Sequence, residues 1–366
     1  MITVELYPDA IGGGGVYAKY LKNCLKVKTF TIKRRVPLRD SDVRQLNLIA
    51  PISKHALFLA VYPLYLLCSI IFLAREKPRI VIANTVYDVL PAIIMKKNLI
   101  FIVHDLTMLY RGSIAKWLLK LAVKKARALV FPSRTAYITL KSVLNVDKEK
   151  VHIIPNPVDI DKLRSIDKKL ARKWLEKKLN MRLDNMKVIL YAGAISKAKG
   201  VHILLKVFER LSKERDDIIL VLVGSIMDKE LMNYLKNYGD KVRYSGTLVG
   251  NAMSVLLKGV DLVVNPTMLN EVQPRIIMEA LAANKHVIAS KIPAIVELCK
   301  TCKANSLCGL FELGNQNSLH RTLNEILNEV ESAMHTSFTP IMGLYSSERF
   351  IKGWIILIRR ILSENL

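Results

Sequence analysis

The sequence predicts an α/β protein in which parallel strands alternate with helices and form two doubly wound sheets. Three observations indicate this fold class: a length of 366 residues, a composition that is 51% hydrophobic, and short apolar runs that alternate with longer helical segments. The length exceeds what a single hydrophobic core usually fills, so two domains are expected. Strand-helix alternation is typical of a parallel sheet covered by helices.

The first half of the chain contains a series of predicted strands, most of them followed by a turn or a helix. They are Ile2–Leu6, Lys26–Lys33, Arg79–Asn84, Leu99–Val103, Ala128–Pro132 and Val151–Pro155. The segment Val16–Leu25 predicts a helix. We expect a first domain over residues 1–157, to which the amphipathic C-terminal segment, residues 347–366, returns.

A polar, charged stretch from Asp159 to Lys187 predicts a linker and the first helix of a second domain, residues 158–346. Strand-helix alternation then resumes. The predicted strands are Val188–Ala192, Ile218–Val223, Val242–Ser245, Asp261–Asn265 and His286–Ala289. Because the two halves repeat one architecture, we expect two Rossmann-like domains that face a cleft.

The net charge is +25, and residues 1–157 contain 25 Lys and Arg against 9 Asp and Glu, which gives +16 of the total. Such an excess favours anionic partners: nucleotides, phosphorylated substrates or an acidic membrane surface. No zinc finger, helix-turn-helix or RNA-binding aromatic signature is present, so no nucleic-acid partner is expected. No secretory signal is evident, which predicts a cytoplasmic location.

The 19 residues from Ala56 to Ala74 carry no charge, which approaches the length that spans a bilayer. Pro63 interrupts this segment, and a predicted buried strand follows it directly. The pattern favours a core helix packed on a sheet, and contact with one membrane leaflet is the alternative.

The segment from Asn270 to Ala280 contains two carboxylates eight positions apart, Glu271 and Glu279. It lies between two predicted strands, so the pair is expected at the strand carboxyl edge, one at the start of a helix and one two turns inside it. Open α/β sheets bind ligands at this edge. Carboxylates accept hydrogen bonds from sugar and ribose hydroxyls, and N–H groups at a helix start suit a phosphate.

Three further features accompany the carboxylates. The glycine run Gly12–Gly15 follows the first strand and allows close approach of a ligand to the backbone. His104 follows a strand, where a histidine can hold or deprotonate a hydroxyl. Lys197 and Lys199 precede a predicted helix and can neutralise a diphosphate. Each feature alone is also compatible with a structural turn, a satisfied histidine or a solvated loop.

The cysteines and acidic pairs give little support for a metal. Cys299, Cys302 and Cys308 lack a nearby fourth ligand, so a surface disulfide or free loop thiols are favoured over zinc. Asp40 and Asp42 match a D-x-D pattern but lie in an arginine-rich stretch and not at a strand end. We therefore expect neither a metal nor another cofactor.

Taken together, the spaced landmarks resemble the retaining glycosyltransferases of family 4, which have the GT-B fold. The resemblance extends over nearly the whole chain and depends on the order of the landmarks. They are Gly12–Gly15, His104, Pro132-Ser133, Ile154-Pro155-Asn156-Pro157-Val158-Asp159, Gly193 to Lys199-Gly200, Val223-Gly224, and Asn265-Pro266 leading to Glu271 and Glu279-Ala280.

The resemblance implies a role for each of these positions. Lys199 would meet the diphosphate of a nucleotide sugar, Glu279 the ribose hydroxyls and Glu271 the transferred sugar. His104 would contact the sugar or assist the acceptor. The remaining donor-binding positions would approach the phosphates: Gly14, Gly15, Gln273, Pro274, Arg275 and Ile276.

One position departs from the family pattern. Arginine usually follows the glycine of the phosphate loop, and here Ala194 follows Gly193. Lys197, in the same loop, is a candidate substitute. The resemblance implies metal-independent, front-face hexosyl transfer. Because one cation is missing, a non-catalytic nucleotide-sugar-binding or scaffold subunit is an alternative, and an epimerase of the same fold is another.

The acceptor side is expected on the first domain, which carries most of the positive charge. Lys116, Lys120 and Lys124 recur along one face of a predicted helix, and Trp117, Leu118, Leu121 and Val123 supply apolar surface. Such a helix can lie on an anionic bilayer or can be a core helix with a solvated face. A lipid-linked or polysaccharide acceptor, and a peripheral position at the inner face of the cell membrane, fit the first interpretation.

Overall fold

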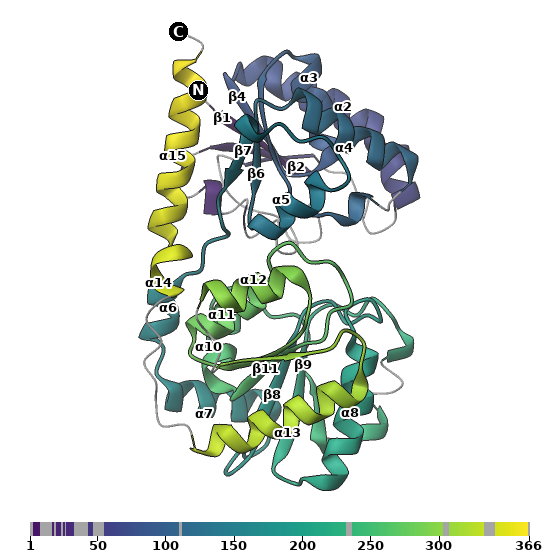
Figure 1. Cartoon of the computed structure of the whole chain (residues 1–366), viewed down its shortest axis with the longest axis vertical. Coiled ribbons are helices and arrows are strands. Elements are labelled where there is room, and N and C mark those ends of the chain that lie inside the picture. Colours follow the sequence, from purple (N-terminus) through teal and green to yellow (C-terminus); the bar gives the residue numbers. More distant parts are fainter. Residues whose placement is uncertain are drawn as a thin grey trace. The chain divides into compact units, whose positions relative to one another are not determined.

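The computed structural model describes residues 3–7, 17, 20–22, 25, 27–32, 43–46, 55–109, 112–231, 236–302, 307–332 and 341–364. The chain divides into two compact units, Met1–Pro157 with Ser347–Leu366 (unit 1) and Val158–Ser346 (unit 2). Each unit is a parallel sheet with helices packed on it (Figure 1), so the predicted α/β fold class is confirmed. The glycine run Gly12–Gly15 and the pair Asp40 and Asp42 lie outside the described residues.

Unit 1 contains a seven-stranded sheet in the order β3-β2-β1-β4-β5-β6-β7, with every described pairing parallel. Its strands are β1 (Thr3–Tyr7), β2 (Lys28–Ile32), β3 (Val43–Leu46), β4 (Ile80–Ala83), β5 (Asn98–Ile102), β6 (Ala128–Phe131) and β7 (Val151–Ile153). Its helices include α2 (His55–Glu76), α3 (Val89–Ile94), α4 (Ser113–Lys125), α5 (Arg134–Lys141) and α15 (Ser347–Ser363), with short 3-10 turns at Val86–Asp88, Thr107–Leu109 and Lys148–Lys150.

Unit 2 contains a six-stranded sheet in the order β10-β9-β8-β11-β12-β13, also parallel. The strands are β8 (Lys187–Ala192), β9 (Ile218–Val223), β10 (Val242–Tyr244), β11 (Leu262–Asn265), β12 (His286–Ser290) and β13 (Cys308–Phe311). The helices include α6 (Ile160–Ser165), α7 (Lys168–Leu179), α8 (Val201–Glu214), α10 (Asn251–Gly259), α11 (Arg275–Ala282), α12 (Pro293–Thr301), α13 (Gln316–Ser332) and α14 (Ile341–Leu344), with a 3-10 segment at Lys236–Lys241.

Two strands were not predicted. β3 lies in an arginine-rich stretch, and β13 begins within the cysteine cluster, which was interpreted as a loop. Both are short and lie at a sheet edge, where one neighbouring strand supplies the pairing and the local sequence needs little apolar periodicity.

Helix α15 packs on unit 1 although it ends the chain. Phe350, Trp354, Leu357 and Ile361 point into the core beneath β4 and β5, and each is at most 2% exposed. The indole Nε1 of Trp354 donates a hydrogen bond to Tyr17 Oη at 2.9 Å. This apolar face, repeated every three to four residues, explains why the C-terminal segment returns to the first unit.

Helix α2 corresponds to the long uncharged segment. It packs on β2 and α3 through a buried side that includes Tyr65, Phe72 and Leu73. Its opposite side is exposed and is also apolar, so the predicted core helix is buried on one face only. In the part of the chain that the structure describes, no helix has the length and apolar character needed to cross a membrane.

Candidate functional site

The strand order of unit 2 reverses between β8 and β11, so the connections after these two strands leave the sheet in opposite directions. Ligands of open α/β sheets bind in the crevice at such a switch point. The loop after β8 contains Lys197 and Lys199, and the loop after β11 contains Glu271. The topology therefore brings the predicted cationic and acidic residues to one place.

Two loops are held together at this point by backbone contacts that require glycine. Gly200 has φ +72°, and a Cβ atom there would lie 1.8 Å from the carbonyl oxygen of Pro266. The amide of Met268 also donates a hydrogen bond to the carbonyl oxygen of Ala198 at 3.1 Å. Because a side chain at position 200 would separate the loops, Gly200 sets the distance between Lys199 and the loop after β11.

A second glycine joins the loop after β8 to the loop after β9. Gly224 has φ +140°, and its Cβ position lies 1.8 Å from the carbonyl oxygen of Gly193. The amides of Gly193 and Ile195 donate to the carbonyl oxygens of Val223 and Ser225 at 2.9 and 2.8 Å. The phosphate-loop segment of the sequence is thus held by the neighbouring strand connections.

The central interaction of the site is an ion pair between Lys199 and Glu271. Nζ lies 2.7 Å from Oε1, and the side chains are 29% and 17% exposed. Partial burial strengthens the attraction, since the effective dielectric constant falls away from water. The pair remains accessible enough for a ligand anion to compete for the lysine and for a hydroxyl to reach the carboxylate.

Helix α11 carries a second ion pair, between Arg275 in its first turn and Glu279 one turn later, with 2.5 Å between Nη2 and Oε1. The expectation that Glu271 begins this helix is wrong. Glu271 lies in the loop, because Pro274 is the N-cap and the helix begins at Arg275. Proline has no N–H group, so the predicted phosphate donors reduce to the amides of Gln273, Arg275 and Ile276.

No side chain caps the N-terminus of α11. Its first N–H groups therefore have no side-chain acceptor from the N-cap residue, and a cation, Arg275, occupies the end of the helix that carries positive partial charge. Such an arrangement is unfavourable without a neighbouring anion. Glu279 supplies one, and a bound phosphate would supply another.

Tyr191 is a site residue that the sequence did not single out. It is the next-to-last residue of β8, is 2% exposed, and donates a hydrogen bond from Oη to the carbonyl oxygen of Ala194 at 2.7 Å. Burial, together with the charge of Glu271, raises the pKa of Tyr191. A tyrosine near the carboxyl end of a mainly aliphatic strand was the available signal.

Lys197 points to a different partner from Lys199. Its Nζ lies 2.7 Å from Glu230 Oε2, with side chains 58% and 77% exposed, and its amide donates to Asp228 Oδ2 at 2.6 Å. An exposed pair of this kind contributes little to stability. The lysine side chain is therefore held only weakly, and it shares the loop of Lys199 without sharing its partner.

In unit 1, His104 lies two residues after β5. Its Nε2 is 3.1 Å from Asn84 Oδ1, which directly follows β4, and its ring meets the Tyr17 ring edge-on with centroids 4.5 Å apart. Burial lowers the pKa of His104 to about 4, although nearby Asp105 opposes this shift. The imidazole is therefore neutral at physiological pH.

A buried acid lies close to Asn84 along the chain. Asp88 accepts hydrogen bonds from Tyr65 Oη at 2.6 Å, from the amide of Thr85 at 2.8 Å and from Thr85 Oγ1 at 3.0 Å. Burial raises the pKa of Asp88 to about 7 in spite of these bonds. The cluster ties α2, through Tyr65, to the segment that positions Asn84.

The predicted acceptor-side helix is α4. Lys116, Lys120 and Lys124 are exposed, and Trp117 is 54% exposed. Leu118 and Val123, which we expected to contribute surface, are buried against the unit 1 core, because helical spacing turns them towards the sheet. The outward apolar residues of α4 are instead Ile114 and Trp117, with Leu121 partly buried beside them.

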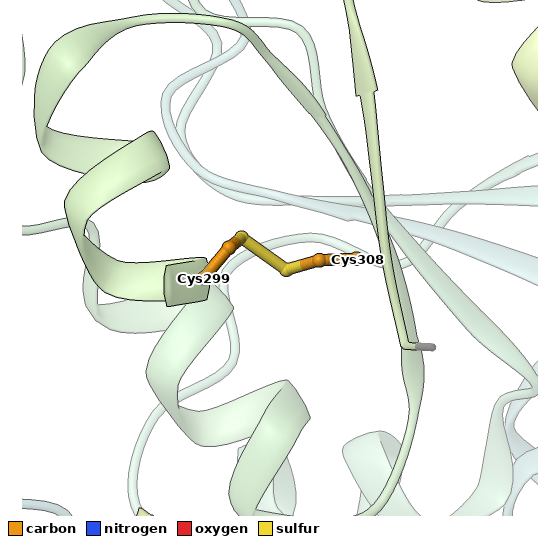
Figure 2. Close-up of a disulfide and its surroundings, with 2 residues drawn as sticks. All are labelled: Cys299 and Cys308. Carbon is orange, nitrogen blue, oxygen red and sulfur yellow. A yellow bond between two sulfur atoms is a disulfide. The ribbon is translucent and has the colours of Figure 1, made fainter. Parts of the chain in front are cut away.

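The cysteine cluster forms a disulfide between Cys299 on α12 and Cys308 on β13, with Cα atoms 6.2 Å apart (Figure 2). Cys299 is only 3% exposed, so the expected surface disulfide lies largely inside unit 2. Cys302 is a buried thiol whose pKa is raised by burial. Among the described residues, no group of three or more His, Cys, Asp or Glu side chains is arranged to hold a metal ion.

Two family models match the chain and together extend over most of its length. Glycosyltransferase Family 4 matches residues 11–162, and Glycosyl transferases group 1 matches residues 173–337. The first match lies in unit 1 apart from its last five residues, and the second lies in unit 2. The second includes Lys199, Glu271, Arg275 and Glu279.

Characterised proteins resemble the chain over part of their length. The lipopolysaccharide 1,2-N-acetylglucosaminetransferase of Salmonella typhimurium is 33% identical over 133 residues, which is 34% of this chain and 35% of that protein. The alpha-monoglucosyldiacylglycerol synthase of Streptococcus pneumoniae is 26% identical over 254 residues, 67% of this chain and 54% of that protein.

Solved structures share the fold over the whole chain. The sucrose-phosphate synthase of Thermosynechococcus elongatus aligns with a TM-score of 0.82, 16% identity and full coverage of both chains. HepE of Anabaena, solved with UDP-glucose, aligns at 0.70 with 19% identity, again over both full chains. With the two family models and the GT-B fold, these matches show that the chain belongs to the group 1, or family 4, glycosyltransferases.

Proposed function

We propose that the protein is a retaining glycosyltransferase that moves a hexosyl unit from a nucleotide-diphosphate sugar to a lipid-linked or polysaccharide acceptor, without a metal. The observation that carries the proposal is the Lys199–Glu271 pair at the β8/β11 switch point, beside the uncapped start of α11. These groups match the two ends of such a donor, a diphosphate and a hydroxyl-bearing sugar.

The ion pair suggests how the donor is received. A diphosphate that approaches Lys199 competes with Glu271 for the ammonium group, and the released carboxylate then accepts hydrogen bonds from sugar hydroxyls. Glu279 would hold ribose hydroxyls in the same way, with Arg275 turning to the phosphates. Each exchange replaces an internal ion pair with two contacts to the donor, so binding does not leave a buried charge unpaired.

The proposed chemistry is front-face transfer. The bond from the anomeric carbon to the diphosphate breaks, the acceptor oxygen bonds to the same face of that carbon, and the acceptor proton passes to the leaving diphosphate. Lys199 and the α11 amides stabilise the charge that develops on the diphosphate. Neutral His104 would accept a hydrogen bond from the sugar or the acceptor, with Gly14 and Gly15 approaching the donor.

The acceptor class rests on relatives and on charge. One named relative is a lipopolysaccharide N-acetylglucosaminetransferase, and the other is a synthase of the glycolipid alpha-monoglucosyldiacylglycerol. Lys116, Lys120 and Lys124 expose three positive charges beside Trp117 on α4. We propose that this helix faces anionic lipid, with the protein peripheral at the cytoplasmic face of the cell membrane and without a nucleic-acid partner.

The test is nucleotide release from UDP-, GDP- and ADP-sugars, with and without membrane lipid extract, comparing the wild type with Glu279→Ala. Release from one donor that lipid increases and the substitution abolishes is the expected result. Binding of a nucleotide sugar without release from any donor would contradict transfer. It would favour the non-catalytic subunit, the alternative that Ala194 supports because a phosphate-neutralising arginine is missing there.

The role of Lys197 as the substitute cation has its own test. Lys197→Ala should sharply weaken donor binding in calorimetry, and Glu230→Gln should not, since it removes a carboxylate that competes with the phosphates for the lysine. Lys213→Ala, which breaks a comparable exposed pair with Glu209, is the matched control. Equal donor affinities for Lys197→Ala and Lys213→Ala would show that Lys197 does not replace the missing arginine.

A further inference from the structure

Helix α2 has two apolar faces, and among the described residues only one of them packs on protein. Leu64, Leu67 and Ile71 recur at i, i+3 and i+7 on the outward face and are 45%, 54% and 42% exposed. The inward face meets the sheet through Phe72, whose ring stacks on Phe30 at 5.2 Å. A helix that is apolar all round is normally covered on all sides, so the outward stripe requires a second apolar environment.

Exposed apolar side chains also lie on the two neighbouring helices. Helix α3 packs against α2 and against α4, and all three lie on one side of unit 1 (Figure 1). Ile94 of α3 and Ile114 of α4 are each 52% exposed, and Trp117 is 54% exposed. We name these six residues the outer face: Leu64, Leu67, Ile71, Ile94, Ile114 and Trp117.

The segment of chain that contains α2, α3 and α4 is mostly positively charged. Residues 61–125 contain ten Lys and Arg against three Asp and Glu. The three acids are already engaged: Glu76 pairs with Lys28 at 2.7 Å, Asp88 is buried, and Asp105 accepts hydrogen bonds from Thr107. Arg75, Lys77, Lys96, Lys116 and Lys120 are exposed.

We propose that the outer face of α2, α3 and α4 inserts into the surface of a bilayer that contains anionic lipid. Apolar side chains enter the acyl boundary, the surrounding cations meet phosphate groups, and Trp117 lies at the level of the headgroups. A second copy of the chain fits less well, because a two-fold interface would bring these cations against their own equivalents. The inference rests on the proposed function for its acceptor and extends the membrane contact from α4 to α2.

The experiment measures binding of the full chain to vesicles of phosphatidylcholine with and without phosphatidylglycerol. The wild type should bind the anionic vesicles, and Leu67→Asn/Ile71→Asn should lower the partition coefficient by about tenfold or more. Ile138→Asn/Val143→Asn is the matched control, since these residues are 62% and 50% exposed but lie outside the three helices. The control should bind within about twofold of the wild type.

The depth to which Trp117 enters the bilayer can be measured without the asparagine variants. Brominated phosphatidylcholine should quench the fluorescence of Trp117, and Trp117→Phe should remove most of that quenching, since Trp354 is buried and Trp174 packs against the core of unit 2. Binding of Leu67→Asn/Ile71→Asn at the wild-type level, or equal losses in the control pair, would overturn the proposal. The proposal would also fail if the wild type does not bind vesicles but forms a dimer in light scattering, and if Leu67→Asn/Ile71→Asn makes that dimer dissociate.

The outcomes separate this surface from the transferase activity. Suppose that the wild type transfers sugar to a detergent-dispersed acceptor but Leu67→Asn/Ile71→Asn does not change vesicle binding. The proposed membrane surface is then wrong, and the proposed transferase activity is supported. If no donor is turned over but the double substitution lowers vesicle binding, the function fails and the surface assignment stands.

Discussion

Nε2 of His104 lies 3.1 Å from Oδ1 of Asn84, so a side chain that directly follows β4 holds the ring that follows the neighbouring strand β5. An amide oxygen only accepts hydrogen bonds, and the contact is therefore a bond when Nε2 carries the proton. This tautomer leaves Nδ1 as an acceptor for a hydroxyl.

The first prediction concerns this contact. Asn84→Asp places a negative charge beside the ring and should raise the pKa of His104 from about 4 towards or above its ordinary value of 6.5. Proton NMR titration of the imidazole measures the shift. Asn84→Ala should leave the pKa low but allow both tautomers, which nitrogen-15 shifts distinguish. An unchanged titration in Asn84→Asp would mean that the two side chains do not meet in solution.

The second prediction concerns pH and stability. Asp88 has a folded pKa of about 7 against an ordinary 3.8, so its contribution is complete at low pH and is lost as pH rises through 7. His104, with a folded pKa of about 4 against 6.5, acts in the opposite direction, and its contribution is lost as pH falls from 6.5 to 4. Between pH 4 and 6.5 the two effects oppose each other.

Asp88→Asn should therefore expose the effect of His104. Relative to the wild type, this variant should lose on the order of 2 kcal/mol of unfolding free energy between pH 6.5 and 4. Urea unfolding at a series of pH values measures the difference. Parallel pH profiles for the variant and the wild type would show that Asp88 titrates normally in the folded state.

The third prediction concerns the Lys199–Glu271 pair. Lys199→Ala removes the cation that would meet the diphosphate and should weaken nucleotide diphosphate binding by roughly 10- to 100-fold. Glu271→Gln removes the competitor for that lysine. It should leave binding of the free nucleotide equal or tighter while it weakens binding of the nucleotide sugar. Calorimetry with the free nucleotide and with the nucleotide sugar measures both affinities. If Glu271→Gln lowers the two affinities equally, the donor does not replace the Lys199–Glu271 ion pair as proposed.

The fourth prediction concerns loop geometry. Gly224→Ala forces a Cβ against the Gly193 carbonyl at an unfavourable φ of +140° and should cost about 3 kcal/mol of stability or more. Gly246→Ala is the matched control. It also has positive φ, +73°, but nothing lies within 4 Å of its Cβ position, so it should cost about 1 kcal/mol. Chemical denaturation measures the unfolding free energy of both variants. If Gly224→Ala and Gly246→Ala lose similar amounts, backbone strain alone explains the loss at position 224.

The fifth prediction concerns the disulfide. Reduction of Cys299–Cys308, which closes a loop of sequence separation 9, should lower the stability of unit 2 by roughly 3 kcal/mol. Trp174, packed against the core that includes both cysteines, is the fluorescence probe. Cys299→Ala/Cys308→Ala should show no response to reductant, and a similar response in this variant would trace the effect to another group.

The sequence by itself determined most of the strands and indicated the residue types that gather at the candidate site. Continuous aliphatic runs such as Ile218–Val223 are typical of buried strands in a covered parallel sheet, and β9 has those bounds. Lys199, Glu271 and Glu279 were identifiable because their residue types and their spacing relative to predicted strands suit the proposed function. These signals are local, and so a single sequence contains them.

Tertiary structure decided which groups meet. No spacing rule pairs Lys199 with Glu271, 72 residues later, because that contact depends on strand order and on the close approach of Gly200 to Pro266. Tyr191, Asn84 and Asp88 likewise gained significance only from neighbours distant in sequence. The two faces of α2 could not be separated in a stretch that is apolar throughout. Only packing against β2 showed which side chains are core and which remain outside, since periodicity identifies a face only where polar residues mark its limits.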